Sequence, residues 1–265
     1  MMQTRLPKSY VFLSDFGSRE RLIMTKTAVC WNGKSTLYNY GGITMKKIIS
    51  FVLCLILGSS LLSGCSNDGE PFEEKSYTPD TPVKAIRLEV RDREIEVLLS
   101  EDEQVHIQYS ENNKEYYDIT VSDENVLTIT SAGNKTWTDY IGGKPSAEDR
   151  KITLQIPNAF LENLILSTTN EDITLSAAAV TGSMDISSNG GNIAFESLDV
   201  GNTLTLNVKN GNVSGTVVGS YDDFSIQSDI KKGESNLPDT KDGGGKTLHV
   251  SCNNGDVDIA FVSNE

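Results

Sequence analysis

Apolar and polar residues alternate one by one along most of the chain after Pro82. The segments KAIRLEV and REIEVLL begin the pattern, and QVHIQY, YDITV, VLTIT and KITLQI continue it. A period of two with many β-branched residues is typical of strands that bury one face. No segment of this region carries the 3.6-residue apolar stripe of a helix. The pattern therefore predicts an all-β domain over residues 83–265.

The second half of this domain repeats with a period of 20 residues. LENLILSTTNEDITLSAAAV starts at position 161, TGSMDISSNGGNIAFESLDV at 181 and GNTLTLNVKNGNVSGTVVGS at 201. A degenerate fourth block starts at 221, and GKTLHVSCNNGDVDIAFVSN follows at 245 after the insert KDGG. In the well-kept blocks the fourth, sixth and thirteenth places are apolar, and the tenth is usually Asn or Gly. Each such block predicts a strand, an Asn/Gly corner, a second strand and a second corner.

A fixed period near 20 is the signature of a solenoid, in which equivalent side chains of successive coils stack in columns. Aligned in chain order, the fourth block places Phe224 in the column of Leu204 and Leu248. Asn and Gly suit the left-handed backbone of a sharp corner. We therefore predict a single-stranded parallel β-solenoid, or β-helix, with coils of about 20 residues. The rule for parallel crossovers makes it right-handed.

Residues 83–160 lack this regular repeat. They predict earlier, less regular coils or an antiparallel sheet that caps the column. For the whole domain, a plain antiparallel β-sandwich is the alternative, because hairpins also alternate strands with turns.

A bacterial export signal occupies residues 45–64. Two lysines follow Met45, an apolar run extends from Ile48 to Leu62, and small residues precede Cys65. This layout is typical of a secretory signal peptide cleaved between Gly64 and Cys65. The run is shorter than the roughly 20 apolar residues that span a bilayer.

The end of this segment, Leu-Ser-Gly-Cys, resembles the lipobox of bacterial lipoproteins. The resemblance implies that the thiol of Cys65 receives a diacylglyceryl group and that Cys65 becomes the first residue. Two or more acyl chains give stable anchoring, so the protein's predicted membrane partner is reached through the lipid on Cys65. An ordinary signal peptide with a chance cysteine is the alternative.

Residues 1–44 have no sustained periodicity and carry six basic and two acidic residues. A signal behind them would not engage the export machinery normally. We predict that translation starts at Met45 and that residues 1–44 are not made, with a genuine N-terminal extension as the alternative. An N-terminal peptide from this segment in the cell's proteome would refute the prediction.

Residues 65–82 continue from the predicted lipidated cysteine into an acidic stretch with three prolines and no apolar repeat. Such a composition predicts a disordered tether. The tether would hold the domain of residues 83–265 away from the lipid surface.

Charge and cysteine content narrow the function classes further. Residues 65–265 contain 15 of the 23 basic and 35 of the 37 acidic residues, a net charge of −20. Such a charge argues against nucleic acid and against a protein face docked on anionic lipid. Once Cys65 is lipidated only Cys252 remains, so no intramolecular disulfide can form.

The sequence offers no recognisable catalytic, metal or cofactor site. His106 and His249 alternate with apolar neighbours and should therefore point to solvent. No nucleophile elbow or zinc spacing is present, and KDGGGK lacks the spacing of a phosphate loop. The twelfth places of the blocks hold Asp172 and Asp256, with Asn192 and Asn212 between them. Calcium at such Asp/Asn corners is a weaker interpretation than turn formation.

Aromatic residues gather between positions 110 and 140. Tyr116 and Tyr117 lie in a strand pattern, whereas Trp137 and Tyr140 lie in the polar stretch GNKTWTDYIGGKPS. We take Trp137 and Tyr140 as candidate ligand contacts on an exposed loop. Covering the end of the core is the alternative role.

The segments LQIPNAFLENLILST, NGGNIAF and NGDVDIAF resemble the bacterial putative-adhesin family, which consists of exported proteins built around a β-strand-repeat domain of unknown function. The resemblance covers roughly residues 84–262. It implies surface attachment, and it carries over no catalytic residue. The degenerate block 221–240 departs from the family pattern.

Together these features predict a non-enzymatic, adhesin-like lipoprotein on the extracytoplasmic face of a bacterial membrane. Its ligand would be a glycan or a surface protein. One alternative is an envelope signalling accessory protein. Another is a polysaccharide-acting β-helix enzyme, which would need a groove lined with carboxylates and bases.

Overall fold

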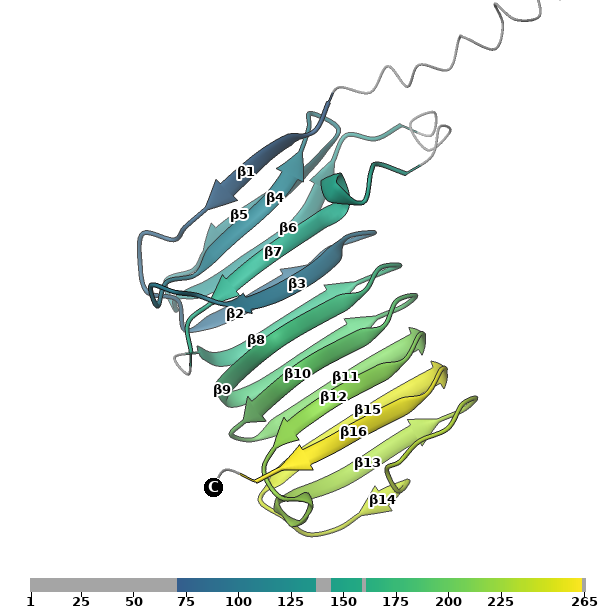
Figure 1. Cartoon of the computed structure of the whole chain (residues 1–265). Coiled ribbons are helices and arrows are strands. Elements are labelled where there is room, and N and C mark those ends of the chain that lie inside the picture. Colours follow the sequence, from purple (N-terminus) through teal and green to yellow (C-terminus); the bar gives the residue numbers. More distant parts are fainter. Residues whose placement is uncertain (1–70, 137–143, 159–160, 264–265) are drawn as a thin grey trace, which may run out of the picture. The chain divides into compact units, whose positions relative to one another are not determined.

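The structure, a computed structural model, describes residues 71–136, 144–158 and 161–263. All of them belong to one compact unit that spans Cys65–Glu265. The described residues form strands and two short 3₁₀ helices, η2 and η3, which confirms the all-β prediction (Figure 1). The elements are β1 (Glu73–Tyr77), β2 (Ala85–Glu89), β3 (Glu94–Leu99), β4 (His106–Glu111), β5 (Glu115–Val121), β6 (Val126–Gly133), η2 (Glu148–Arg150), β7 (Lys151–Ile156), β8 (Leu161–Thr168), β9 (Ile173–Ser188), β10 (Ile193–Val200), β11 (Thr203–Asn210), β12 (Val213–Val218), η3 (Tyr221–Asp223), β13 (Phe224–Ile230), β14 (Thr240–Lys241), β15 (Lys246–Asn254) and β16 (Val257–Val262).

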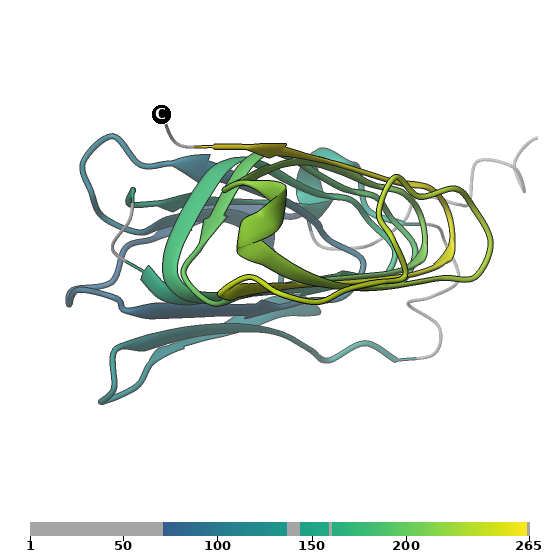
Figure 2. The same ribbon diagram turned by 90° about the horizontal axis from the view of Figure 1, so that it is seen from below.

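The strands form two facing layers that one long strand joins (Figure 2). The first half of β9 pairs with β3 and β10, and its second half pairs with β8 and β11. The first layer therefore runs β1-β4-β7-β3-β9-β10-β12-β16, and the second runs β5-β6-β2-β8-β9-β11-β15-β13-β14. Each of the regular 20-residue coils contributes one strand to each layer, as a flattened solenoid requires.

The register of the parallel strands confirms the coil length. Ile173 pairs with Ile193, and Ile193 pairs with Val213, so equivalent residues are 20 positions apart. In the other layer Met184 lies opposite Leu204 in the same register. This parallel pairing contradicts the plain antiparallel sandwich. The right-handed sense of winding stays a prediction.

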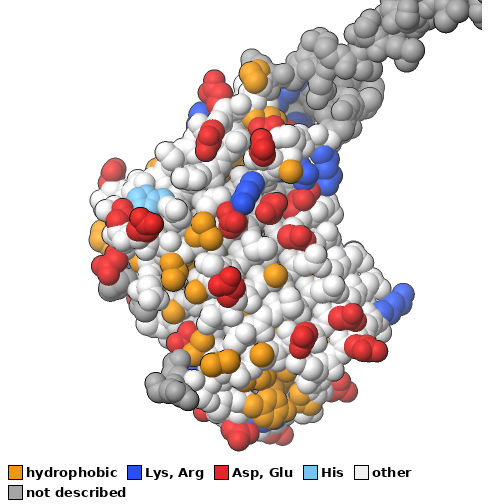
Figure 3. Space-filling view, viewed as in Figure 1, with side chains coloured by type: hydrophobic (Ala, Val, Ile, Leu, Met, Phe, Trp, Pro, Cys, Tyr) orange, Lys and Arg blue, Asp and Glu red, His pale blue; other side chains and the backbone are white. Residues whose placement is uncertain are grey.

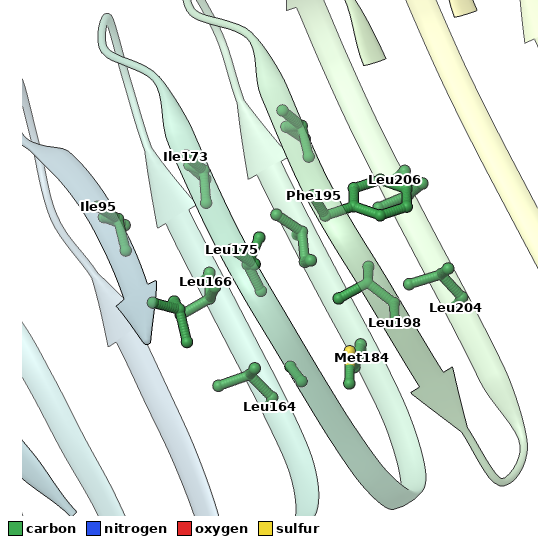
Figure 4. Close-up of a cluster of buried hydrophobic side chains, with 14 of the residues drawn as sticks. Ile95, Leu164, Leu166, Ile173, Leu175, Met184, Phe195, Leu198, Leu204 and Leu206 are labelled. Carbon is green, nitrogen blue, oxygen red and sulfur yellow. The ribbon is translucent and has the colours of Figure 1, made fainter. Parts of the chain in front are cut away.

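The columns of apolar side chains form the core between the layers (Figure 4). Leu164, Met184, Leu204 and Leu248 lie in one column, and each is at most 1% exposed. Fully burying such a side chain contributes about 1.5–3 kcal/mol. Cys252 is buried in the same core, and burial raises the pKa of its thiol.

The last two coils do not stack in their order along the chain. The register of the fourth block also differs from our alignment, which was wrong there. β15 lies between β11 and β13, and β16 pairs with β12. The last coil is therefore inserted between the coil of residues 201–220 and the degenerate segment of residues 221–241. Ile226, and not Phe224, lies opposite Leu248.

The apolar pattern explains this inserted order. The fifth block keeps the Asn/Gly corner and both apolar columns, so it can be covered on both sides. The degenerate block keeps a stacked glycine, Gly233, at the corner, but after it forms only the isolated Ser235–Val257 bridge in place of a second strand. It then folds back through β14, which is antiparallel to β13. It is thus suited to close the end of the stack, where Phe224 is fully buried.

The N-terminal end combines both arrangements that we predicted for residues 83–160. β2, β3, β6 and β7 make parallel pairs and extend the solenoid. β4 and β5 are antiparallel to β7 and β6, and they cap the two layers.

The strand-bearing part begins ten residues earlier than the predicted boundary at position 83. β1 lies within the segment expected to be tether, and it pairs antiparallel with β4. Its first four residues are exposed, so it carries no apolar signal, and backbone pairing and the Lys75–Glu111 ion pair at 2.7 Å hold it. Within the described ranges no helix is long and apolar enough to cross a bilayer.

Candidate functional site

A pocket of about 700 Å³ lies at the N-terminal end of the solenoid, beside an Asn/Gly corner. The β2–β3 turn, the start of β5, the end of β6 and the segment leading into η2 form its walls. Asn170, from the corner between β8 and β9, completes the lining. The solenoid therefore brings together lining residues that are up to 79 positions apart in the sequence.

The pocket is basic, although the chain is acidic. All six lysines and arginines between positions 91 and 150 line it: Arg91, Arg93, Lys114, Lys135, Lys144 and Arg150. Two lining carboxylates, Asp92 and Glu115, and the adjacent Glu171 reduce the local charge to +3. Lysine and arginine side chains gather at this end of the molecule (Figure 3).

Arg93 is the fixed centre of the pocket wall and is only 4% exposed. Its Nε donates to the Tyr117 hydroxyl at 2.6 Å, and its Nη2 donates to Glu115 Oε2 at 2.7 Å. Burial lowers the pKa of Arg93, but Tyr117 and Glu115 outweigh burial and hold that pKa above its ordinary value. Burial also raises the pKa of Tyr117, although Arg93 opposes it. Arg93 is therefore a permanent, immobile cation.

The β2–β3 turn that presents Arg91 and Arg93 is held by the neighbouring corner. Asp92 adopts a positive φ of 53°, and its backbone N–H donates to Thr169 Oγ1 at 2.9 Å. Its carboxylate accepts from Asn170 Nδ2 at 2.5 Å. Hydrogen bonds to both the backbone and the side chain of Asp92 thus fix the turn.

Two carboxylates are each shared by two cations of the pocket. Glu115 contacts Arg93 at 2.7 Å and Lys135 at 2.6 Å. Glu171 contacts Lys144 at 3.1 Å and also pairs with Arg150. Arg91 differs, because it is exposed and takes part in no ion pair with any described residue.

The site residues that the sequence nominates cannot be compared with this pocket. Gly64, Cys65, Trp137 and Tyr140 lie outside the described residues, so their predicted roles stay predictions. Tyr116 and Tyr117 line the pocket, as do Lys135 and Lys144 on either side of the undescribed segment. Sequence reasoning missed the basic cluster because its members never form a local run. The available signal was that 6 of the 15 basic residues after position 64 fall between positions 91 and 150.

Both histidines are partly exposed. His106 Nδ1 lies 2.8 Å from Thr78 Oγ1, and its Nε2 lies 2.8 Å from Asp102 Oδ1. The hydrogen bond with His106, followed by that with Ser100, lowers the pKa of Asp102 to about 2. The contacts follow the order of a hydrolase triad, but Thr78 and Asp102 are exposed on the surface and line none of the pockets found among the described residues. They fasten the end of β1 to β4.

The carboxylates and amides in the twelfth place of the blocks form a hydrogen-bonded ladder along one corner. Asp172 accepts from the backbone N–H of Asn192 at 2.7 Å, and Asn192 accepts from that of Asn212 at 2.9 Å. Asn212 accepts from Asp256 at 2.9 Å, and Asp256 accepts from Glu234 at 2.8 Å. Among the described side chains, no group of three His, Cys, Asp or Glu is placed to hold a metal ion.

The two-layered solenoid with parallel 20-residue coils defines the class of this protein as a β-strand-repeat protein. The family model described as Toastrack DUF4097 matches residues 83–264. The chain belongs to this family, which confirms the resemblance inferred from the sequence.

Several solved structures of bacterial proteins are similar to this chain at low sequence identity. A putative cell adhesion protein from Clostridium sporogenes is 14% identical with a TM-score of 0.48, covering 72% of this chain and 100% of that chain. A putative adhesin from Parabacteroides merdae is 18% identical with a TM-score of 0.36, over 72% of this chain and 82% of that chain. A putative adhesin from Bacteroides fragilis is 12% identical with a TM-score of 0.30, over 73% and 98%. No curated protein matches.

Proposed function

We propose that this protein is a lipid-anchored, non-enzymatic surface protein that binds an external ligand through its N-terminal pocket. The observation that carries the proposal is the concentration of six basic side chains in one hollow of an otherwise acidic solenoid. A cluster of basic side chains on an otherwise acidic protein attracts anionic groups to the cluster. Ligand binding is the role that this arrangement supports best.

The non-enzymatic part of the proposal is supported by how the candidate catalytic groups are used. Asp172 and Asp256, the carboxylates that a β-helix enzyme would need, accept backbone hydrogen bonds from the next coil. His106 and Asp102 lie on an open surface. A catalytic base and its partner work in a hollow that excludes water.

The anchoring part rests on the lipobox-like segment ending at Cys65. β1 follows the predicted tether and lies at the same end of the solenoid as the basic pocket. A lipid on Cys65 would therefore hold the pocket-bearing end toward the membrane. Trp137 and Tyr140 stay candidate contacts for the ligand.

Metabolic labelling with a fatty acid tests the anchor in the full-length protein expressed in bacteria. We expect label on the wild-type protein in the membrane fraction, and neither label nor membrane retention for Cys65→Ser. Cys252→Ser is the matched control and should keep its label, because the Cys252 thiol is buried in the core. Label retained by the Cys65→Ser variant would refute lipidation at this residue.

Attachment of cells that display the protein tests the binding role. Cells with the wild-type protein should adhere to surfaces coated with glycans or matrix proteins more than cells without it. The double variant Arg91→Glu/Lys144→Glu should lose this gain, and Lys231→Glu/Lys232→Glu, at the other end of the solenoid, should keep it. Equal adhesion with and without the protein would overturn the binding role.

A further inference from the structure

We infer that the N-terminal pocket binds an acidic glycan, a saccharide chain that bears carboxylate or sulfate groups. The inference rests on the proposed function and names the class of ligand for the same site. Arg91 and Lys144 would contact the anionic group, and Tyr116 would contact the sugar ring beside it.

The charge distribution favours a ligand that places only a few negative charges near the protein. The local excess of +3 lies in a chain whose residues 65–265 carry a net −20. A rigid polyanion such as duplex nucleic acid, or a flat anionic membrane, would bring many negative charges against the acidic surface as well. Charges beyond about 8 Å are screened at physiological salt. A flexible chain that places one or two anionic groups in the pocket gains the attraction without most of the repulsion.

The cations of the pocket suit carboxylates, because they already hold the protein's own Glu115 in the pocket and Glu171 beside it. Glu115 is shared by Arg93 and Lys135, and Glu171 is shared by Lys144 and Arg150. Guanidinium groups match the oxygens of carboxylates and other oxyanions through paired hydrogen bonds. Arg91 extends this arrangement to the rim, where it is exposed and joins no described ion pair.

The rim of the pocket, formed by the β2–β3 turn that carries Arg91, is pre-organised for binding. Asp92, between Arg91 and Arg93, is held by Thr169 and Asn170. The backbone N–H of Arg91 itself donates to Ser131 Oγ at 3.0 Å. A fixed backbone lowers the entropy that the protein loses when a ligand binds.

The saccharide part of the ligand is assigned to Tyr116 and the hollow behind it. Tyr116 borders the basic pocket and also a second hollow of about 690 Å³, which Asn112, Asn113 and Pro71 line. An aromatic side chain offers an apolar face, and nearby amides offer hydrogen-bonding groups to hydroxyls. A chain of sugars could therefore lie from the basic pocket across Tyr116 into the second hollow.

The test measures binding of defined polymers to the chain from residue 65 with Cys65→Ser, by calorimetry at 50 and 300 mM NaCl. The probes are polygalacturonate, which is carboxylated, heparin, which is sulfated, neutral dextran, and a duplex DNA oligonucleotide. We expect at least one of the two acidic glycans to bind, with affinity that falls at high salt. Dextran and the oligonucleotide should bind at least tenfold more weakly.

Variants locate the site. Arg91→Ala/Lys144→Ala should weaken glycan binding at least tenfold, and Tyr116→Ala should weaken it at both salt concentrations. Lys231→Ala/Lys232→Ala removes the same charge from exposed positions at the other end and should change affinity less than twofold. Circular dichroism melting curves verify that each variant is folded.

Several results would overturn the inference: equal binding of dextran, tighter binding of the oligonucleotide, or full affinity in the Arg91/Lys144 variant. If displaying cells adhere but the purified protein binds neither acidic glycan, the ligand class is wrong and the proposed function stands. If acidic glycans bind the pocket but displaying cells do not adhere, the inference stands and the attachment role fails.

Discussion

At the scale of single residues, the ladder of Asp and Asn side chains explains how a corner is copied from coil to coil. Asp172, Asn192, Asn212 and Asp256 each offer a side-chain oxygen to a backbone N–H one coil further along the stack. A carboxylate oxygen and a carboxamide oxygen can both accept such a hydrogen bond. This is why Asp and Asn interchange at one place of the repeat, and why the aspartates do not mark a catalytic column.

Removing one acceptor from the ladder should destabilise the solenoid by a small, measurable amount. Asp172 accepts from both the backbone N–H and the Nδ2 group of Asn192. We expect Asp172→Ala to lower the free energy of unfolding by about 1–2 kcal/mol, the usual net value of such bonds. Asp172→Asn keeps an acceptor oxygen and should change it by less than about 0.5 kcal/mol. Urea denaturation measures both, and equal losses would show that the acceptor does not matter.

The Asp102–His106 contact predicts a pH dependence of stability. The folded pKa of Asp102, about 2, lies below its ordinary value of 3.8. A lowered pKa means that the carboxylate stabilises the fold fully above its unfolded pKa, and that this contribution is lost as the pH falls from about 4 toward 2. Asp102→Asn should flatten the stability profile in that window.

NMR titration of the Asp102 carboxyl carbon provides the direct check of this prediction. A midpoint near 4 would show that His106 and Ser100 do not hold the carboxylate in its charged form. Thr78→Val is a useful comparison, because Thr78 contacts His106 and not Asp102.

At the scale of elements, a column of glycines sets how closely successive corners approach. Gly191, Gly211, Gly255 and Gly233 lie one above another, and a Cβ on any of them would meet backbone of the preceding coil. The column follows the stacking order and places Gly255 before Gly233. The order of these glycines is therefore independent evidence that the last coil is inserted into the stack.

Gly211→Ala should destabilise the solenoid, because its φ is +155° and the new Cβ would collide with the carbonyl group of Gly191. We expect a loss of about 1–3 kcal/mol, as for other strained backbone positions. Gly245→Ala is the control, since nothing lies within 4 Å of its Cβ position. Thermal unfolding followed by circular dichroism compares the two. Identical melting temperatures would show that the corner can widen without loss.

The sequence predicts those parts of the fold in which residues that contact each other also follow a regular spacing along the chain. Strand periodicity and the 20-residue columns are local, so the coils from Leu161 to Ser220 were predicted in register. Alignment in chain order could not reveal that the fifth block enters between the third and fourth. β1 was missed because backbone bonds, and not apolar side chains, hold it to β4.

The basic pocket lay beyond sequence reasoning for a related reason. Its cations come from four separate segments, and the coils bring them together only through stacking. The pattern of basic residues shows that they are concentrated between positions 91 and 150, but not that they share one hollow. Of the aromatic residues grouped between positions 110 and 140, Tyr116 and Tyr117 line the pocket, and the roles of Trp137 and Tyr140 stay predictions.

At the scale of the whole molecule, the inserted C-terminal coil completes the core. Leu248, Val250, Cys252, Val257 and Ile259 are at most 2% exposed, and they connect the third coil to the closing segment. At about 1.5–3 kcal/mol for each buried apolar side chain, they contribute on the order of 10 kcal/mol. That is comparable with the total stability of a typical domain.

Truncation after Gly244 should therefore abolish the native fold. We expect the shortened chain to be insoluble or to lose its cooperative thermal transition, since β11, β12 and β13 would all lose a partner strand. Truncation after Ser263 removes only two residues and should unfold as the complete chain does. A cooperative transition in the chain that ends at Gly244 would show that the closing segment can dock directly on β11.

The same insertion bears on the order in which the coils can assemble during synthesis. A solenoid whose coils stack in chain order can grow as each repeat leaves the ribosome. Here the segment of residues 221–241 has no surface to dock on until the last repeat has emerged and taken its place. A chain that ends before residue 245 would leave β11 and β12 without their partner strands, so this stacking order makes the fold depend on synthesis of the last repeat.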